Sequence, residues 1–513
     1  MTRAAALLLA GLAAGPSLVA SASDIFARSA SDGHVLAVNF QKERTTHPGH
    51  RKRDTVFAKL DNEYLLYYVD VKVGTPPQDI RLQIDTGSSD VWAPSSNSAF
   101  CRSKKNQCKE GSYNASKSST RQLVSRNGFK ISYLDGSHAE GDFISEAFTI
   151  GNITVKDMQI GVGLDTDIDA GILGIGYPAN SVSEEMYPGL VDQLVSHGYI
   201  KAKAYSLYLN DQEANTGSIL FGGIDTEKFQ GNLTGLPIQL ERDRTVPTEF
   251  TVALTSVALS IEGRQEEVIS SNALPAVLDS GSSLTYLPNS TVAAIVKNFD
   301  GYWDPNLKSY IVPCSLSNNH NDFVTYRFGG SKGPEIRVAL EELTNYILDV
   351  NGDIWTDVNN NPQCIFGIQP QPADFGDTYI FGDTFLRSAY VVYDLDGNKI
   401  WLAQTIFNAT KSRILEIQKS SSSRSGVPNA SGVASLVSAR PTSTALHKPR
   451  PTAVTLAKTG TASSANPEET TASGDAPAET NSNTRSNFGL RVEADKLFSF
   501  LAVALACMLS IFI

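Results

Sequence analysis

The sequence predicts an all-β protein with two similar halves and few helices. Runs such as "LLYYVDVKVG" and "FTVALTSVALSI" alternate in the manner of half-buried β-strands. Helical spacing is clearest in "GLVDQLVSHGYI" and "STVAAIVKNFD". The 513 residues exceed what one hydrophobic core usually organises. We therefore expect two lobes, residues 54–240 and 241–410.

One acid-containing turn occurs twice, and this repeat defines the two halves. Asp85 lies in "QIDTGSSDVWAPSS", and Asp279 lies in the similar "AVLDSGSSLTYLP". A single Asp-Ser/Thr-Gly is expected by chance in about one chain in four of this length, whereas two extended copies are far rarer. Each turn alone could be an ordinary Asx-type turn at a strand end. The pair instead indicates a duplicated site.

Two similar lobes would bring these turns together, so that Asp85 and Asp279 face each other across a cleft. Carboxylates at that distance cannot both ionise cheaply, so they share a proton and their pKa values separate. The ionised acid can then take a proton from water while the protonated acid polarises a substrate carbonyl. This chemistry needs no metal and no cofactor.

The remaining residues of the two turns are expected to support the acids. The glycines let the backbone turn sharply and bring N–H groups near the carboxylates. Ser88 and Ser282 can donate hydrogen bonds to the outer carboxylate oxygens. The supporting set is Thr86, Gly87, Ser88, Ser280, Gly281 and Ser282.

These motifs resemble those of the pepsin-type aspartic endopeptidases over about residues 60–405. "YYVDVKVGTPPQ" is similar to the family's first strands, and "LFGGID" resembles another common stretch. "GILGIG" and "YIFGDTFLRSAYVVYDLDGNKIWLAQ" resemble the segments that thread beneath each catalytic loop. The resemblance implies a bilobal pepsin-like fold of two pseudo-symmetric β-barrel-like lobes with the catalytic cleft between them. It also implies protein or peptide substrates and a monomer.

The family carries a hairpin, the flap, whose tyrosine closes over substrate. Here "ISYLDGS" puts Tyr133 in that position with Gly136 at the turn, and Trp92 matches its usual hydrogen-bond partner. Leu134 departs from the family, in which glycine is common. Asp135 matches a residue that lines the pocket before the scissile bond. A carboxylate there predicts cleavage at Lys or Arg, and the alternative is a solvated hairpin-tip acid.

Four cysteines fall within the predicted lobes and allow three disulfide connectivities. Proximity in the sequence favours Cys101 with Cys108 and Cys314 with Cys364. Cys507 lies in an apolar tail. Six Asn-x-Ser/Thr sites are candidates for N-glycosylation: Asn114, Asn152, Asn232, Asn289, Asn408 and Asn429.

The N-terminus has the pattern of a secretory signal peptide over residues 1–22. Residues 23–53 then form a basic prosegment that ends at Lys52-Arg53, a dibasic site for a processing convertase. We expect this segment to dock electrostatically on the acidic body, since the net charge of the chain is -11. The same charge argues against nucleic acid as a partner.

The C-terminus changes composition after residue 410. Residues 411–487 are rich in Ser, Thr, Ala and Pro, and are predicted to form a disordered stalk. Residues 488–513 resemble a GPI-attachment propeptide, with Asn487 as the attachment residue. A plain membrane tail is the alternative. Together with the prosegment, this layout resembles the fungal GPI-anchored, yapsin-like proteases, which implies the extracellular face of the plasma membrane or the cell wall.

Three rival interpretations come from the same residues. A broad acid protease would prefer apolar residues to Lys or Arg. An inactive peptide-binding module of the same fold would have lost an Asp or Gly from one turn, and both turns are intact. A structural mannoprotein of the cell surface would not need two matched acid turns.

Overall fold

The structure is a computed structural model, and it describes residues 34–43 and 66–442 apart from 104–106, 215, 348–353, 421–424 and 435–436. All of them lie in the first of two units into which the chain divides, Met1–Val454 and Thr455–Ile513. Strands dominate, as predicted, and the two predicted helices are present as α1 (Leu190–Ser196) and α2 (Asn289–Val296). A short third helix, α3 (Asp383–Leu386), follows the strand over Tyr379–Phe381.

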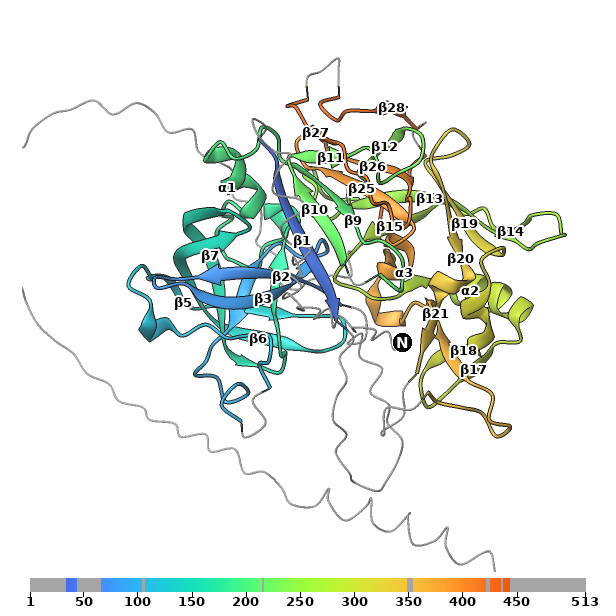
Figure 1. Cartoon of the computed structure of the whole chain (residues 1–513), viewed down its shortest axis with the longest axis horizontal. Coiled ribbons are helices and arrows are strands. Elements are labelled where there is room, and N and C mark those ends of the chain that lie inside the picture. The colour runs from blue at the N-terminus through green and yellow to red at the C-terminus, as the bar shows by residue number, and fades with distance from the viewer. Residues whose placement is uncertain are drawn as a thin grey trace, which may run out of the picture. The chain divides into compact units, whose positions relative to one another are not determined.

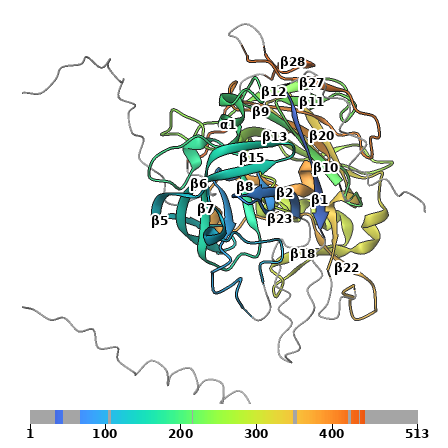
Figure 2. The ribbon, with the colours of Figure 1, turned by 60° about the vertical axis from the view of Figure 1, so that its left-hand side comes forward.

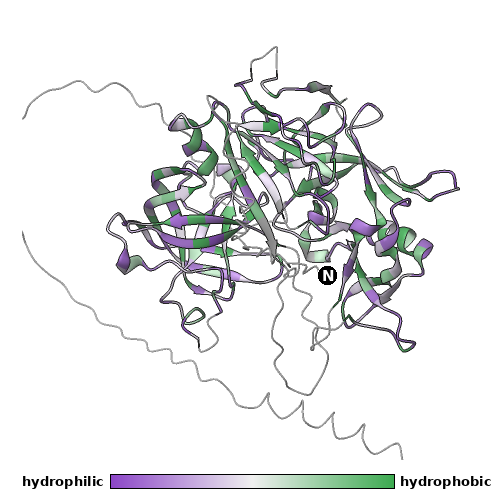
Figure 3. Ribbon diagram, viewed as in Figure 1, coloured by the Kyte–Doolittle hydropathy of each residue, from purple (hydrophilic) through white to green (hydrophobic). Residues whose placement is uncertain are grey.

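The N-terminal lobe is a β-sheet that closes on itself. Its strands pair in the order β2-β3-β8-β4-β7-β6-β5, and an additional pairing of β2 with β6 closes the barrel. Burial alternates along much of β2 and β6, in agreement with the sequence pattern that predicted strands. Figure 3 shows hydrophobic and hydrophilic residues interspersed along the strands of this sheet. The strands are β2 (Leu66–Val73), β3 (Gln78–Asp85), β4 (Val91–Pro94), β5 (Gln122–Ser132), β6 (His138–Ile150), β7 (Ile153–Thr166) and β8 (Gly171–Gly174).

The C-terminal lobe contains an eight-stranded and a four-stranded sheet. The larger sheet has the order β20-β19-β13-β15-β24-β16-β23, with β14 paired to β13. Its strands are β13 (Thr251–Ser260), β14 (Glu267–Ser270), β15 (Leu274–Leu278), β16 (Thr285–Leu287), β19 (Phe323–Phe328), β20 (Glu335–Ala339), β23 (Ile368–Pro370) and β24 (Tyr379–Phe381). The smaller sheet comprises β17 (Tyr302–Asp304), β18 (Ser309–Pro313), β21 (Thr344–Tyr346) and β22 (Gln363–Phe366).

The same arrangement of strands surrounds the acid turn in each lobe. In the N-terminal lobe, β3 pairs parallel with β8, and β4 pairs antiparallel with β8. In the C-terminal lobe, β15 pairs parallel with β24, and β16 pairs antiparallel with β24. Each acid therefore lies at the end of a strand whose parallel partner is one of the threading segments expected from the sequence.

A set of central strands extends the sheet of the N-terminal lobe and comes from both halves of the chain (Figure 1). Strand β9 of the first half pairs with β25 of the second half, so strands from both sides of the boundary predicted at residue 240 lie in this sheet, whereas the two sheets of the C-terminal lobe are separate from it. The central strands are β9 (Ala204–Tyr208), β10 (Thr216–Phe221), β12 (Leu233–Pro237), β25 (Ala389–Asp394) and β26 (Lys399–Gln404).

Part of the predicted prosegment is a strand of this sheet. Strand β1 (Leu36–Glu43) pairs with β10 and β2, and it lies beside both of them in Figure 2. Its apolar side chains Leu36, Val38 and Phe40 are buried. The expectation of electrostatic docking is therefore wrong for these residues, because strand pairing and apolar burial hold them in place.

The predicted start of the disordered stalk at residue 411 is also wrong. Strand β27 (Ile414–Glu416) pairs with β11 (Gly223–Asp225), and β28 (Ala430–Val433) pairs parallel with β12. Ile417, Val427 and Ala434 are buried against the body. The few apolar residues of a mostly polar segment are thus sufficient to dock it. We call residues 411–442 the C-terminal extension.

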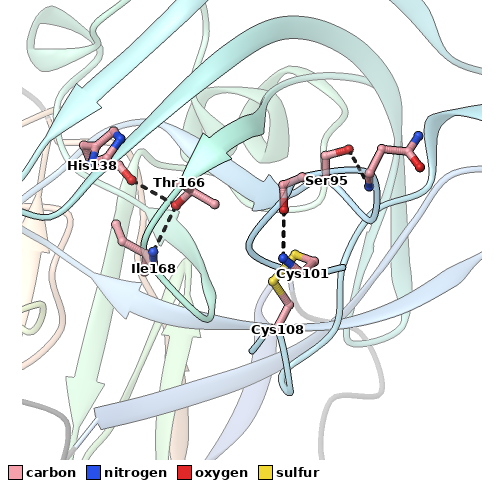
Figure 4. Close-up of a disulfide and its surroundings, with 8 residues drawn as sticks. Ser95, Cys101, Cys108, His138, Thr166 and Ile168 are labelled. Carbon is pink, nitrogen blue, oxygen red and sulfur yellow. Dashed lines mark hydrogen bonds between the residues drawn. A yellow bond between two sulfur atoms is a disulfide. The ribbon is translucent and has the colours of Figure 1, made fainter. Parts of the chain in front are cut away.

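Both disulfides favoured by the sequence are present. Cys101 and Cys108 close a seven-residue separation, and Cys314 and Cys364 link η5 (Cys314–Asn318) to β22. Figure 4 shows the first disulfide, where the Cys101 backbone N–H donates to Ser98 Oγ at 3.1 Å. Among the residues described, no helix is long and apolar enough to cross a membrane; the apolar tail at 497–513 lies outside them.

Candidate active site

The two acids of the repeated turns lie together between the lobes. Both are buried, with 5% of Asp85 and 3% of Asp279 exposed. A methyl group placed on Gly87 would lie 2.5 Å from Asp279 Oδ1, and one placed on Gly281 would lie 2.5 Å from Asp85 Oδ1. Each glycine therefore makes room for the acid of the opposite lobe. Any larger residue at either position would collide with a carboxylate.

Each carboxylate is oriented by donors from its own turn. Asp85 Oδ1 accepts from the backbone N–H groups of Gly87 at 2.8 Å and Ser88 at 3.2 Å, and Asp85 Oδ2 accepts from Ser88 Oγ. Asp279 Oδ1 accepts from the Gly281 N–H at 2.8 Å, and its Oδ2 accepts from Ser282 Oγ at 2.7 Å. The serines thus hold the outer oxygens, as expected, and the inner oxygens face each other.

Thr86 and Ser280 join the two turns rather than contacting the acids. The Ser280 N–H donates to Thr86 Oγ1 at 2.9 Å, and the Thr86 N–H donates to Ser280 Oγ at 3.2 Å. Each hydroxyl also donates to the backbone of the opposite lobe, Thr86 to the Leu278 carbonyl and Ser280 to the Ile84 carbonyl. The sequence predicted that these two residues support the acids directly. In the structure they instead bond each other across the boundary between the lobes.

The electrostatics of the pair favour a shared proton. Burial, and then the neighbouring charge of Asp279, raise the pKa of Asp85 to about 8. The hydrogen bonds from Ser88 and Gly87 act in the opposite direction, because they stabilise the ionised form. The pair therefore keeps a shared proton at pH values where an isolated aspartic acid has lost its own.

The flap is the hairpin between β5 and β6. Gly136 takes a φ of +87°, which a residue with a side chain rarely adopts. Trp92, which is fully buried, donates from Nε1 to Tyr133 Oη at 2.8 Å. Burial, and then the charge of Asp85, raise the pKa of Tyr133 well above its usual value, so the tyrosine lies within the field of the dyad.

The base of the flap is tied to β7. Thr166 Oγ1 donates to the His138 carbonyl at 2.9 Å, and the Ile168 N–H donates back to Thr166 Oγ1 at 3.1 Å (Figure 4). Because His138 is the first residue of β6, this bond fixes the hairpin where it leaves the sheet.

A family model described as eukaryotic aspartyl protease matches residues 66–405, which span both acid turns and the flap. The chain belongs to this family. It is 47% identical over 399 residues to a probable aspartic-type endopeptidase opsB of Aspergillus oryzae, covering 76% of this chain and 78% of the relative. It is 33% identical to the aspartic proteinase yapsin-3 of Saccharomyces cerevisiae, covering 80% of each chain.

The same fold is found in a solved structure. The crystal structure of the aspartic proteinase from Irpex lacteus matches with a TM-score of 0.55 and 21% identity, over 74% of this chain and all of that one. The chain is accordingly an aspartic-type endopeptidase. The pepsin-like fold expected from the sequence is confirmed.

Two flap residues of this aspartyl protease face different surroundings. Asp135 is exposed, and its Oδ1 accepts from the Ser137 N–H at 2.9 Å and the Ser137 hydroxyl at 2.6 Å. Leu134 is half-buried and packs against a small apolar cluster of the C-terminal lobe, built on Val277 and Ile380. The flap tip therefore contacts the C-terminal lobe.

The sequence did not single out Asp90, a buried acid in the same loop as Asp85. Its carboxylate accepts from Ser181 Oγ at 2.7 Å, the Val182 N–H at 2.9 Å and Tyr187 Oη at 2.7 Å. It thereby ties the chain after β8 to the catalytic loop of the protease. The available signal in the sequence was an acid placed directly before the apolar pair Val91-Trp92.

The other predicted sites differ in what the structure says of them. Five glycosylation candidates are exposed, whereas Asn114 is half-buried and caps η2 (Ala115–Lys117) with its side chain. Lys52, Arg53 and Asn487 lie outside the described residues. Within the described part of the protease, no group of three or more His, Cys, Asp and Glu could hold a metal ion.

Proposed function

We propose that this protease hydrolyses peptide bonds with a water molecule activated between Asp85 and Asp279, and that it prefers sites containing Lys or Arg. The observation that carries the proposal is the mutual approach of the two acids, each of which occupies the space left by the glycine of the opposite turn.

The mechanism follows from the proton that Asp85 and Asp279 share. The protonated acid donates a hydrogen bond to the substrate carbonyl oxygen, while the ionised acid removes a proton from water. The water oxygen bonds to the carbonyl carbon, giving a tetrahedral intermediate. The C–N bond then breaks, and a proton from the dyad passes to the leaving nitrogen. Gly87, Ser88, Gly281 and Ser282 hold the carboxylates in position throughout.

The preference for basic residues rests on Asp135. Its hydrogen bonds with Ser137 fix one carboxylate oxygen, and the neighbouring Leu134 packs in the same apolar cluster as Tyr286 of β16. Burial, and then the charge of Asp135, raise the pKa of Tyr286 to about 12, which agrees with this packing of the flap tip on the C-terminal lobe. A Lys or Arg side chain between them would meet a carboxylate.

A broad protease with apolar preference is the second candidate. It is favoured by the apolar cluster beside the flap, in which Leu134, Tyr286 and Phe375 pack against Val277 and Ile380. The change Asp135→Thr separates the two candidates, because it should lower kcat/KM for Lys and Arg peptides about tenfold more than for Phe and Leu peptides. Equal losses on both would exclude the role of Asp135.

We also propose secretion and anchoring at the cell surface by GPI, after removal of the signal peptide and cleavage at Arg53. The support is the sequence of the two termini together with two disulfides, which form in oxidising compartments. If the anchor is present, phosphatidylinositol-specific phospholipase C should release the protein from cells. Deletion of residues 488–513 should abolish its attachment to the cell surface.

The first experiment is hydrolysis of a peptide library between pH 4 and 6, with and without pepstatin, beside the variant Asp279→Asn. Pepstatin-sensitive cleavage next to Lys or Arg that is lost in the variant is the expected result. Pepstatin-sensitive cleavage between apolar residues would support the catalytic role of the dyad and would exclude the preference for Lys and Arg. Absence of cleavage by folded, processed protein would favour a peptide-binding module.

A further inference from the structure

The C-terminal extension ends beside the loop that borders the cleft. Its last described residues, 439–442, run along residues 239–242, the segment that connects β12 to β13. Ala439 donates its N–H to Gln239 Oε1 at 2.9 Å, and the Arg242 N–H donates to the Pro441 carbonyl at 3.1 Å. Ala439 and Pro441 are buried.

The Arg440 guanidinium donates hydrogen bonds to the backbone of the same segment. Its Nε donates to the Leu240 carbonyl at 3.0 Å, and its Nη2 donates to the carbonyls of Glu241 at 2.7 Å and Arg242 at 3.1 Å. One side chain thus satisfies three successive carbonyls. This is a specific docking geometry and not the behaviour of a solvated linker.

Thr442 then bonds directly to the cleft loop. Its N–H donates to both carboxylate oxygens of Asp377, at 3.1 and 2.8 Å, and its hydroxyl donates to Asp377 Oδ2 at 2.5 Å. Asp377 lies between η7 (Ala373–Phe375) and β24, two residues after Phe375 and two before Tyr379.

The loop held in this way faces the flap. The ring of Phe375 lies 5.9 Å from that of Tyr286, and both residues belong to the apolar cluster that receives Leu134 of the flap tip. The same cluster contains Val277, two residues before Asp279. A displacement of Asp377 would therefore move an apolar wall next to the dyad.

We propose that the C-terminal extension is part of the substrate-binding apparatus: Thr442 holds Asp377, and Asp377 acts as a positioning residue that sets the Phe375 wall of the cleft. The inference rests on the proposed function of the cleft. It predicts that the extension governs KM and the choice of one apolar substrate residue, whereas kcat follows from the dyad.

A double-mutant cycle in the full-length protein tests this coupling. Asp377→Ala removes the acceptor, and Thr442→Pro removes the backbone donor together with the hydroxyl. Each single variant should raise KM for peptides with a large apolar residue beside the scissile bond about fivefold, with kcat within about twofold. The double variant should be no worse than either single one. Additive losses, or losses of kcat at constant KM, would overturn the proposal.

Two controls isolate the contact. Asp377→Asn keeps one acceptor oxygen and should restore KM to within about twofold of the wild type. Asp357→Ala removes an acid of the same lobe whose hydrogen bonds run to residues 359 and 361 of its own turn, and it should leave the apolar selectivity unchanged.

The rate of backbone hydrogen exchange over residues 373–379 reports how firmly this loop is held, and its measurement needs no substrate. We expect faster exchange there in Thr442→Pro than in the wild type, and equal exchange would reject the proposal. A wild-type protein that fails to cleave any peptide would count against the proposed function, while the exchange result would still decide whether the extension positions this loop.

Discussion

Thr86 and Ser280, 194 residues apart, exchange hydrogen bonds through each other's backbone and hydroxyl groups. Both residues are buried, so the two backbone N–H groups would be left without an acceptor if the exchange were broken, while each hydroxyl also donates to a carbonyl of the opposite lobe. The pair fixes the distance between the lobes at the point where the acids meet. It therefore links the stability of the lobe interface to the geometry of the dyad.

Replacing Thr86 by Val should destabilise the protein by about 1–3 kcal/mol, because it keeps the side-chain shape but leaves the Ser280 N–H without its acceptor. Urea unfolding would measure the loss. Thr149→Val is the matched control, since the Thr149 hydroxyl bonds the Thr154 hydroxyl at the surface. Equal losses of unfolding free energy in both variants would mean that the bonds between the lobes stabilise the protein no more than a surface hydrogen bond does.

The raised pKa of Asp85 predicts how stability depends on pH. In the unfolded chain this acid ionises near pH 4, whereas in the folded protein it keeps its proton until about pH 8. Between these values the unfolded state binds fewer protons, so the contribution of Asp85 to stability falls as pH rises through the window. Asp85→Asn should abolish this loss and raise Tm more at pH 7 than at pH 4, by at least about 2 °C.

The control for that measurement is Thr149→Val, which changes no titrating group. Its Tm difference should be the same at both pH values to within about 1 °C. Catalysis should follow the same proton: activity of the wild type should disappear as pH rises through the pKa of Asp85, because the acid that polarises the carbonyl is then ionised.

The hydrogen bond from Trp92 to Tyr133 should matter for catalysis more than for folding. Trp92→Phe keeps an aromatic ring in the buried site but removes the donor that orients the flap tyrosine. We expect kcat/KM to fall about tenfold. Adding Tyr133→Phe should cost little more, because the two changes break one bond. Trp303→Phe, at an exposed tryptophan, serves as the control.

The features that could be predicted from the sequence are those that depend on short stretches of it. The acid turns, α1 and α2 follow from residues close together in the chain, and the disulfides follow from pairing each cysteine with its nearest neighbour among the four; the structure contains all of them. The exchange between Thr86 and Ser280 could not be predicted in the same way, because a hydroxyl in a turn has many local partners and its actual one lies in the other lobe.

The C-terminal extension was missed for a different reason. Average composition over 411–487 is that of a disordered chain, and averaging hides single apolar residues that fit particular positions on the body. Ile417 and Val427 occupy such positions, and Arg440 finds three backbone carbonyls. Neither periodicity nor a motif marks these contacts.

Ile417 gives a direct test of whether the extension belongs to the folded body. Its side chain is 1% exposed and packs in the cluster that contains Ile224 and Trp401. Ile417→Ala should therefore lower the free energy of unfolding by about 2–4 kcal/mol, through lost burial and the cavity left behind. Val358→Ala, at a side chain that is 99% exposed, should change it by less than about 0.5 kcal/mol. If both variants unfold at the wild-type urea concentration, residue 417 does not pack on the protease in solution. A large loss confined to Ile417→Ala would place the start of the stalk beyond the extension.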